Sequence, residues 1–325
     1  MTTILITGGA GYIGSHAVLT FRDAGYDVAV LDDLSTGVRA NLPAEVRLHQ
    51  GDVGDGGLLD RVLAEERPAA VLHFAGSIVV PESVADPAKY YRNNTATSLT
   101  LVDACVRHGI GRFVFSSTAA VYGLPPGGIA DEDTPTAPIN PYGRSKLMVE
   151  QMLADMSKAH GLAYAVLRYF NVAGADPNGR SGQSTPKATH LIKVACEVAT
   201  GKRGRMAVYG TDYDTPDGTC VRDYIHVSDL ADAHLAVLRH IDRTGTGVTF
   251  NCGNGRGYSV REVLDAMTRI LGRPIPVDEE PRRAGDPAML IADARRIADQ
   301  IDWHARYTAI DDMVASALAW ERKGP

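Results

Sequence analysis

A glycine-rich turn between a buried strand and a helix restricts this chain more than any other feature. Residues 7–14 read Thr-Gly-Gly-Ala-Gly-Tyr-Ile-Gly, after the apolar run Thr3–Thr7 and before the amphipathic segment Ser15–Ala24. Glycines permit the tight turn and the close approach of a phosphate, and free N–H groups at a helix start attract anions. Asp32 ends the next apolar run, where a carboxylate accepts a hydrogen bond from an adenosine ribose and repels a 2′-phosphate. The spacing therefore predicts a dinucleotide-binding unit that prefers NAD to NADP.

Apolar runs alternate with helical patterns through the first half of the chain. The candidate strands, rich in Val, Ile, Leu and Phe, are Thr3–Thr7, Asp27–Leu31, Arg47–His49, Ala70–His73, Arg112–Ser116 and Ala163–Tyr169. The amphipathic segments between them are Ser15–Ala24, Gly56–Glu66, Lys89–His108 and Pro141–His160. This order predicts an α/β fold of the Rossmann type, a doubly wound parallel sheet with helices on both faces. Ligands of such sheets lie beyond the carboxyl ends of the strands.

The pattern becomes less regular after residue 170. Gly174–Thr189 is rich in Gly, Pro, Ser and Thr and indicates a long loop. The elements expected after it are a helix (Leu191–Thr200), a strand (Met206–Tyr209), a loop (Gly210–Arg222), a helix (Ser228–His240), a strand (Thr249–Asn251) and helices near Ser259–Leu271 and Ala309–Lys323. We expect residues 1–175 to form the NAD-binding domain and residues 176–325 a smaller α+β domain. The segment Ile225–Asn251 is a candidate to return and pack on the first domain.

The composition excludes several classes of function. The formal net charge is −6, with 45% hydrophobic and 22% charged residues, which is typical of a globular protein and gives no reason to expect nucleic acid or a membrane as partner. The four cysteines are scattered without a Cys-x-x-Cys pair, so we expect neither disulfides nor a metal site. The chain enters a strand at once, and no apolar run reaches the length of a membrane helix. We therefore expect a cytoplasmic protein.

Tyr142 and Lys146 are four residues apart and share one face of the expected helix. A phenol ionises near pH ~10, and an ammonium one turn away favours the phenolate, so we expect Lys146 to lower the pKa of Tyr142. A positively charged nicotinamide acts in the same direction. Residues 115–122, Phe-Ser-Ser-Thr-Ala-Ala-Val-Tyr, place three hydroxyls at a strand end, where one can share a proton with Tyr142 or instead cap a helix. The pair indicates proton transfer coupled to hydride transfer.

Together these segments resemble the UDP-galactose (UDP-glucose) 4-epimerase family of the extended short-chain dehydrogenase/reductase superfamily. The resemblance covers nearly the whole chain and rests on TGGAGYIGSH, LDDLSTG, HFAG, YYRNN, SSTAAVYG, PYGRSKLMVE, RYFNVAGA, DGTCVRDYIHVSDLADAH and RRAGD. It implies reversible C4 epimerisation of UDP-glucose and UDP-galactose through a 4-keto intermediate, with tightly bound NAD. It also implies a homodimer, for which Lys89–His108 and Pro141–His160 are candidate contact helices.

On the cofactor side, the resemblance gives each residue a role. Asp32 corresponds to the acid at the ribose. Asp52 corresponds to a contact of the adenine edge, although it fits a loop cap equally well. The other residues on the NAD side are Gly8, Gly11, Tyr12, Ile13, Gly14, Asp33, Ser35, Thr36, Gly37, Val53, Phe74, Ala75, Gly76, Ile78, Asn93, Tyr142, Lys146 and Phe170.

On the substrate side, the resemblance makes Tyr142 the base, Lys146 its partner and Thr118 the hydroxyl at the sugar 4-OH. Arg222 and Arg283 correspond to arginines that hold the diphosphate by charge-assisted bonds. The remaining substrate-side residues are Asn171 at the nucleotide sugar, Tyr209 on uracil, Asp286 at the uridine ribose, His190 and Leu191 along the substrate, and Leu290 beside the hexose. Tyr209 fits a core aromatic equally well.

Two positions depart from the family pattern. Ile78 stands where many relatives carry a Lys near the nicotinamide ribose, which bears on how firmly NAD is retained. Leu290 is intermediate between the bulky aromatic residue that goes with plain hexoses and the small residues that admit N-acetyl groups. N-acetylhexosamine, pentose and uronate substrates therefore stay open as alternatives.

Two other activities fit the same scaffold less well. A 4,6-dehydratase needs an acid and a base before the Val-Tyr-Gly sequence, where this chain has Ala119 and Ala120. A non-catalytic NAD-binding regulator has no need of Tyr142 and Lys146, which are both present together with the substrate-side arginines.

Overall fold

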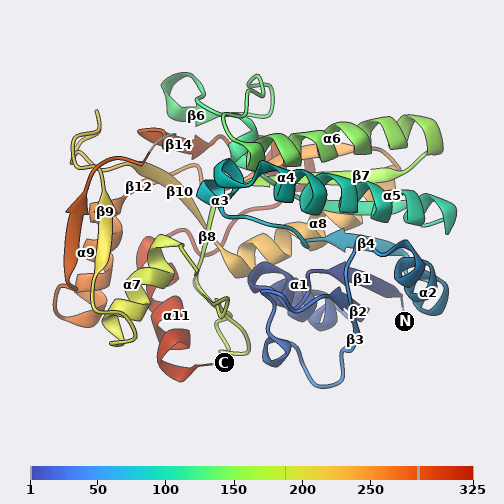
Figure 1. The fold of residues 1–325 in the computed structure, drawn as a ribbon, viewed down its shortest axis with the longest axis horizontal. Helices are drawn as coiled ribbons and strands as arrows, with labels where there is room; N and C mark the ends of the chain where they lie inside the picture. Colours follow the sequence, from blue (N-terminus) through green and yellow to red (C-terminus); the bar gives the residue numbers. More distant parts are fainter. Residues whose placement is uncertain (1, 187, 284–285, 325) are drawn as a thin grey trace.

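A seven-stranded parallel sheet forms the larger part of the computed structural model, which describes residues 2–186, 188–283 and 286–324 (Figure 1). Its strands, in spatial order, are β11 (Val248–Cys252), β7 (Ala163–Tyr169), β5 (Arg112–Thr118), β4 (Ala70–His73), β1 (Thr3–Thr7), β2 (Asp27–Asp32) and β3 (Arg47–Gln50). Every neighbouring pair is parallel. The chain order reverses between β1 and β4, so the carboxyl ends of these two strands border the expected ligand crevice. The doubly wound parallel sheet predicted from the sequence is confirmed.

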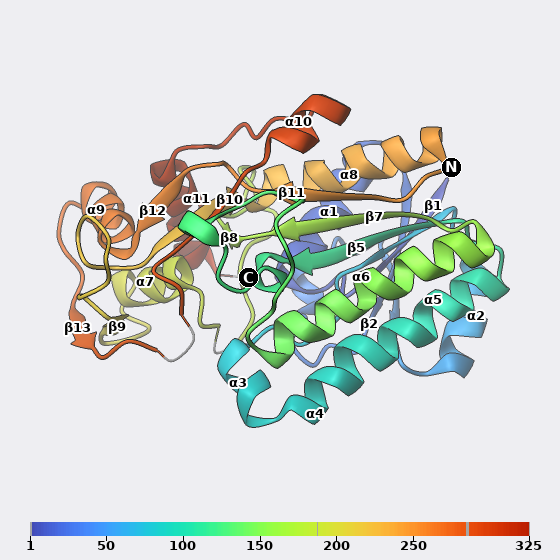
Figure 2. The ribbon, with the colours of Figure 1, turned by 90° about the horizontal axis from the view of Figure 1, so that it is seen from above.

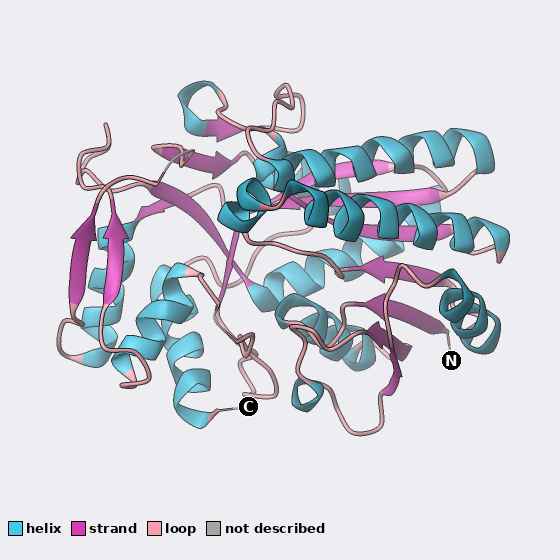
Figure 3. Ribbon diagram, viewed as in Figure 1, coloured by secondary structure: helices cyan, strands magenta, loops and turns pink. Residues whose placement is uncertain are grey.

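Helices cover both faces of this sheet, as Figures 2 and 3 show. On one face lie α1 (Tyr12–Asp23) and α8 (Val227–Thr244), which pack on each other, and on the other lie α2 (Gly56–Glu66), α5 (Thr97–Arg107) and α6 (Pro141–His160). Successive side chains of a strand point to opposite faces. In β1, accordingly, Ile4 and Ile6 belong to the core under α1 and α8, whereas Leu5 belongs to the core under α2 and α5.

The smaller part of the molecule lies at the carboxyl edge of the sheet, to the left in Figure 1. Its strands are β6 (Ile129–Ala130), β8 (Asn171–Ala173), β9 (Met206–Tyr209), β10 (Val221–His226), β12 (Gly257–Ser259), β13 (Val277–Glu280) and β14 (Met289–Ala292). Its helices are α7 (Leu191–Ala199), α9 (Val260–Leu271) and α11 (Ile310–Lys323), whereas α10 (Arg295–Ile301) packs on α8 and β11 of the larger part. The first half of β10 pairs with β12 and β14, and its second half pairs with β8, which follows β7 directly. β10 therefore ties the two parts of the molecule together.

The structure corrects several expected boundaries. The stretch Lys89–His108 is not one regular helix but α4 (Pro87–Tyr90), the π-helical segment η2 (Tyr91–Ala96) and α5. The hydroxyls of Thr97 and Ser98 donate to the carbonyls of Asn93 and Asn94 four residues earlier. Such bonds compete with the regular helical ladder and accompany local distortion. Val221 and Arg222, expected in a loop, begin strand β10.

Short elements complete the chain: α3 (Val80–Ala85) and the 3-10 turns η1 (Arg39–Asn41), η3 (Ala119–Val121) and η4 (Pro126–Gly128). Within residues 2–186, 188–283 and 286–324, no helix has both the length and the apolar character that spanning a membrane requires.

Candidate active site

The glycine turn leaves the start of α1 open to an anion. Gly11 is the N-cap of α1, no side chain caps the free N–H groups, and no acidic residue stands in the first turn. A Cβ added at Gly14 would lie 2.2 Å from the carbonyl oxygen of Gly8, so only glycine fits there. A Cβ at Gly11 would meet only that oxygen, at 3.2 Å. The cradle therefore fits the pyrophosphate of a dinucleotide, with Tyr12 and Ile13 in the first turn of the helix.

The turn after β2 is organised by Asp32. The Asp32 carboxylate is buried and accepts from the backbone N–H groups of Ala10 and Leu34, at 2.9 and 2.8 Å. Burial raises its pKa, and these two hydrogen bonds oppose the shift. A Cβ at Gly37 would lie 2.7 Å from the carboxylate, so glycine allows the loop to pass close by. Asp33 accepts from the backbone N–H and hydroxyl of Ser35, which lies exposed beside Thr36.

Asp32 and Asp52, the two carboxylates predicted at the adenosine end of the cofactor, lie in different settings. Asp52 is exposed, follows β3 and accepts from the N–H of Gly54 at 2.7 Å, which is the loop-capping geometry. Val53 beside it is buried in the core under α2. Asp32, in contrast, lies at the edge of the glycine turn through its bond to Ala10.

The segment after β4 is held against the π-helical turn. Phe74, Ala75 and Gly76 follow β4, and Gly8 packs directly on Ala75. The Asn93 amide donates to the Ser77 hydroxyl at 2.9 Å. The glycine turn and Asn93 therefore both contact the segment after β4, at the β1–β4 crevice, whereas Ile78 is 48% exposed.

Tyr142 and Lys146 begin the long helix α6, which Asn140 caps by accepting from the N–H of Gly143 at 2.8 Å. The Lys146 ammonium is buried, donates to the Ser116 carbonyl oxygen at 3.0 Å and lies 4.9 Å from the centre of the Phe115 ring. It also lies 3.6 Å from the position of a Cβ at Gly76, so the pair faces the end of β4.

Only one of the three hydroxyls at the carboxyl end of β5 is placed to serve Tyr142. The Ser116 hydroxyl bonds to the Tyr169 hydroxyl, and the Ser117 hydroxyl donates to Glu150. The Thr118 hydroxyl accepts from the N–H of Ala120 at 3.1 Å. It also hydrogen-bonds to the Tyr142 side chain, and this bond lowers the pKa of Tyr142. Thr118 is therefore the hydroxyl that can pass a proton to or from Tyr142.

Burial decides the proton affinities of this pair. It lowers the pKa of Lys146 to about 8, and the Glu150 carboxylate one turn further along α6 opposes the shift. Burial also raises the pKa of Tyr142 above its ordinary value. The sequence predicts a Tyr142 pKa below the ordinary value of a phenol, and in this structure that pKa lies above it. Desolvation of the phenolate is the larger effect, and the ammonium bonds to the Ser116 carbonyl.

The two predicted diphosphate arginines come from distant segments, and Arg222 is partly buried whereas Arg283 is exposed. Arg222, on β10, donates to the carbonyl of Val221 at 2.9 Å and lies 3.8 Å from the Asp286 carboxylate. The Arg283 guanidinium stacks on the Tyr209 ring, 3.6 Å from its centre. The structure therefore gathers the four predicted substrate-side residues Arg222, Asp286, Arg283 and Tyr209 into two contacting pairs.

The other substrate-side positions line the junction of the two parts. The Asn171 amide donates to the Asp223 carbonyl at 3.2 Å, which joins β8 to β10. Leu290, on β14 and paired with Arg222, packs with Phe170 against the small core of Ala119, Val121 and Tyr122. Leu290 therefore lies near the strand end that carries Thr118.

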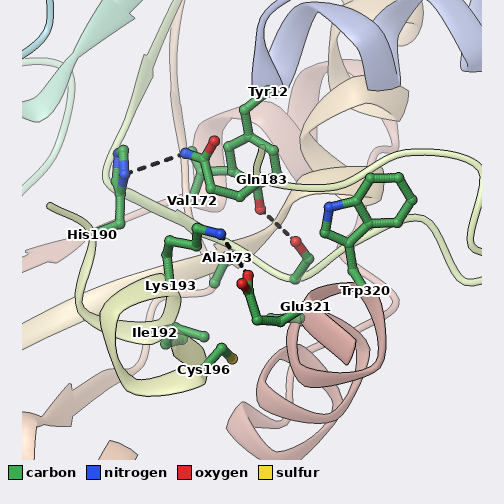
Figure 4. A pocket seen from close by; sticks show the side chains of 12 residues that line it. Tyr12, Val172, Ala173, Gln183, His190, Ile192, Lys193, Cys196, Trp320 and Glu321 are labelled. Carbon is green, nitrogen blue, oxygen red and sulfur yellow. Dashed lines mark hydrogen bonds and ion pairs between the residues drawn. The ribbon is translucent and has the colours of Figure 1, made fainter. Parts of the chain in front are cut away.

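His190 and Leu191 begin α7, beside a small cavity of about 20 Å³ that also reaches Tyr12 (Figure 4). His190 faces the amide of Gln183 at 3.3 Å, and burial lowers the pKa of His190. The cavity has room for about one water, not for a nucleotide sugar. Tyr12 donates to the Gly174 carbonyl at 2.6 Å and thereby connects the glycine turn to the loop that precedes α7.

Sequence reasoning missed the polar residues that support Tyr142 and Lys146. The Asn94 amide bonds to both backbone groups of Ser77 and to the Ser145 hydroxyl. Glu150 forms a buried ion pair with Arg168 at 2.6 Å. The sequence carried one signal for Glu150, since it lies four residues after Lys146 on the same helix face.

Alanine at Gly11 and at Gly14 should separate cofactor binding from folding. At Gly14 the methyl group collides with backbone, so we expect a lower melting temperature and loss of NAD together. At Gly11 the methyl group makes one tight contact, 3.2 Å from the Gly8 carbonyl oxygen, and occupies space at the expected pyrophosphate, so we expect weaker NAD binding with a smaller fall in melting temperature than at Gly14. Calorimetry with added NAD, together with thermal unfolding, measures both. Unchanged NAD affinity in the Gly11 variant contradicts this placement.

Comparisons with known proteins agree with this geometry. The NAD dependent epimerase/dehydratase family matches residues 4–253. The UDP-glucose 4-epimerase of Azospirillum brasilense is 59% identical over 319 residues, which cover 98% of this chain and 92% of that protein.

Two solved structures are similar over the whole chain. The UDP-glucose 4-epimerase of Bifidobacterium longum, in complex with NAD+ and UDP, has a TM-score of 0.94 and 43% identity, covering 100% of this chain and 99% of that one. The UDP-Glc/GlcNAc 4-epimerase of Campylobacter jejuni has a TM-score of 0.86 and 44% identity, with both chains covered completely. The family resemblance seen in the sequence is thus confirmed, and this chain belongs to the UDP-glucose 4-epimerases of the NAD-dependent epimerase/dehydratase family.

Proposed function

We propose that this enzyme interconverts UDP-glucose and UDP-galactose by reversible inversion at C4, through a 4-keto intermediate. The observation that carries the proposal is the meeting of Tyr142, Lys146 and Thr118 with the open glycine cradle at one crevice. Bound in this cradle, NAD would supply a hydride acceptor for C4 and, once reduced, a hydride donor to the other face of the 4-keto sugar, so no net oxidant would be needed.

Tyr142 is the group that takes the proton of the 4-OH. As a phenolate it does so directly or through the Thr118 hydroxyl, which hydrogen-bonds to Tyr142 and so provides a short path for the proton. Lys146 is buried beside the pair and donates to the Ser116 carbonyl. Its ammonium favours the phenolate, against the desolvation that raises the pKa of Tyr142.

Arg222 and Arg283 hold the diphosphate while the sugar turns. Forked guanidinium groups bind phosphate oxygens by two bonds each. Tyr209 and Asp286 contact uracil and the uridine ribose, and Asn171 with His190 and Leu191 contact the sugar and its link to the diphosphate. The 4-keto sugar can then rotate about its bond to an anchored diphosphate and present either face.

The same proposal assigns the two parts of the chain. Residues 1–175, with α8 and β11 packed on their sheet, hold NAD, and the remainder of residues 176–325 holds the UDP-sugar. A homodimer through α5 and α6 is supported by the exposed Leu99 and Met148 on these helices. Sedimentation of a Met148→Glu variant tests that contact. The cytoplasmic location stays a prediction.

An assay with each sugar nucleotide tests the function directly. Purified enzyme is incubated with UDP-galactose, and the products are separated by chromatography. We expect the same final ratio of UDP-glucose to UDP-galactose whether the reaction starts from UDP-galactose or from UDP-glucose, without consumption of added NAD. Bound NAD with no interconversion would favour the alternative of a regulator.

A UDP-N-acetylhexosamine 4-epimerase is the second candidate, since the Campylobacter jejuni enzyme is as similar in identity as the enzyme from Bifidobacterium longum. Leu290 packs beside Phe170 at the expected hexose position. Substitution by Ser should raise the preference for N-acetylated over plain substrate roughly 10–100-fold, and substitution by Tyr should lower it, because pocket volume is worth this much in specificity. Ratios of kcat/KM for the two substrates measure the change. Equal ratios in both variants would remove Leu290 from the sugar pocket.

A further inference from the structure

Tyr142, Lys146 and Glu150 follow one another at four-residue intervals and share one face of α6. The strand β5 lies against this face. The Ser116 carbonyl accepts from Lys146 at 3.0 Å, and the Ser117 hydroxyl donates to Glu150. Lys146 and Glu150 are 3% and 7% exposed. A carboxylate thus stands one helical turn behind the buried ammonium.

Glu150 is paired not with Lys146 but with Arg168 of β7. The Arg168 guanidinium donates through two nitrogens, at 3.1 Å from Nε to both carboxylate oxygens and at 2.6 Å from its terminal nitrogen to Oε2. Arg168 is fixed in turn by the Tyr122 hydroxyl at 3.0 Å, and Tyr122 donates to Asn251 at 2.6 Å. Both members of the pair are therefore held at fixed distances behind Lys146.

The titratable and charged groups around Lys146 differ in charge. Glu150 on α6 and His73 on β4 interact with the ammonium itself. Tyr142 lies one turn before it on α6, Arg168 on β7 is paired with Glu150, and Tyr169 on β7 and Tyr90 on α4 lie near Tyr142. Burial and Lys146 lower the pKa of His73 to about 3, so it is neutral at physiological pH. Burial raises the pKa of each of the three tyrosines, so they are neutral in the resting enzyme, and Tyr142 becomes a phenolate only in the proposed reaction. Of the groups named, Glu150 and Arg168 alone contribute charge.

We propose that Glu150 and Arg168 are positioning residues that act through Lys146, Glu150 keeping the buried ammonium charged and Arg168 limiting that effect. The inference rests on the proposed role of Lys146 beside Tyr142. This role would explain why the ion pair between Glu150 and Arg168 is buried behind the site, because a buried ion pair often adds little net stability to a fold. Lys146, whose pKa burial lowers to about 8, is close enough to neutrality for small changes in nearby charge to alter its protonation.

Opposite substitutions give opposite expected shifts. Glu150→Gln removes the negative charge and leaves Arg168 unopposed, so the titration midpoint of Lys146 should fall. Arg168→Met removes the positive charge and leaves Glu150 unopposed, so the midpoint should rise. We expect each shift to be roughly one pH unit, which is the lower end of the pKa shifts that a nearby charge produces. The double variant should lie between them, and Arg168→Lys should restore the original midpoint.

NMR titration of 13Cε-lysine-labelled enzyme with its bound cofactor measures the midpoint, with the Lys146 signal assigned by its loss in Lys146→Met. Glu66→Gln is the matched control, since Glu66 is a buried carboxylate paired with Arg47 at the far end of the sheet. It should lower the melting temperature without moving the Lys146 signal. Midpoints that shift in the same direction in Glu150→Gln and Arg168→Met, or in neither, overturn the inference.

The pH profile of kcat separates this inference from the proposed function. Lys146 acts as an ammonium, so activity should fall as pH rises through its midpoint, and this alkaline limb should move down in Glu150→Gln and up in Arg168→Met. If the NMR midpoints move in opposite directions while the limb stays fixed, the electrostatic inference holds and the role of Lys146 in catalysis fails.

Discussion

Replacing Tyr142 by Phe is expected to lower kcat for UDP-galactose roughly 10²–10⁴-fold or more while NAD stays bound. In the proposed mechanism the Tyr142 phenolate oxygen accepts the proton, and the Thr118 side chain hydrogen-bonds to Tyr142. The ring itself remains, so its edge contact with Tyr90, at 6.3 Å between centres, should persist. Steady-state rates, together with NAD content after purification, measure the effect.

Tyr90→Phe is the matched control for this prediction. Its hydroxyl donates to the Val79 carbonyl and to Glu82, away from Thr118. We expect a modest loss of stability and turnover within several-fold of the parent enzyme. Near-normal turnover in a folded, NAD-containing Tyr142→Phe enzyme would falsify the assignment of the base.

Replacing Lys146 by Met should separate stability from activity. Burial lowers the pKa of Lys146 to about 8, below its value in the unfolded chain. The unfolded chain therefore binds more protons between these values, and the stability lost by burying Lys146 is regained as pH rises from about 8 toward about 10.5. Below pH 8, Met should stabilise the fold by up to about 3 kcal/mol, less the penalty for leaving the Ser116 carbonyl without its donor.

The same variant should lose roughly 10²-fold or more in kcat, because the Tyr142 phenolate forfeits its neighbouring ammonium. Partial recovery is expected above pH 9, where hydroxide ionises the phenol without help. Lys146→Arg, which keeps the charge, is the control. Thermal unfolding at pH 7 and pH 10 tests the expected stability change. The pH profile of kcat tests the expected loss of activity. A Met variant that is less stable at pH 7 and fully active contradicts them.

The regular part of the fold was predictable from local patterns. The runs Thr3–Thr7 and Ala163–Tyr169 and the helix Pro141–His160 are observed with the predicted bounds, because continuous apolar strands and strong caps such as Asn140 are local signals. The strand β6 has two residues and β8 has three, too few for any period to show. The π-helical turn depends on hydroxyl bonds of Thr97 and Ser98 that have no pattern in the sequence.

The site was predictable where its residues are neighbours in the sequence and less so where they meet across the fold. Tyr142 and Lys146 could be paired because helix geometry fixes their spacing. Arg168 meets Glu150 only because β7 lies beneath α6. The predicted direction of the Tyr142 pKa shift differs from the observed one for the same reason, because the desolvation that raises this pKa depends on burial by distant segments.

The pairing of β11 with β7 has a consequence for how this polypeptide comes to be folded. Ala165 lies in register with Val248, so the last sheet strand emerges from the ribosome long after its neighbour. During that delay β7 presents bare N–H and C=O groups, an edge to which another nascent molecule can attach. The segment between β7 and β11, which includes α7 and β10, must form a long loop before the two strands can pair. Contacts so remote in sequence make this last step of folding slow.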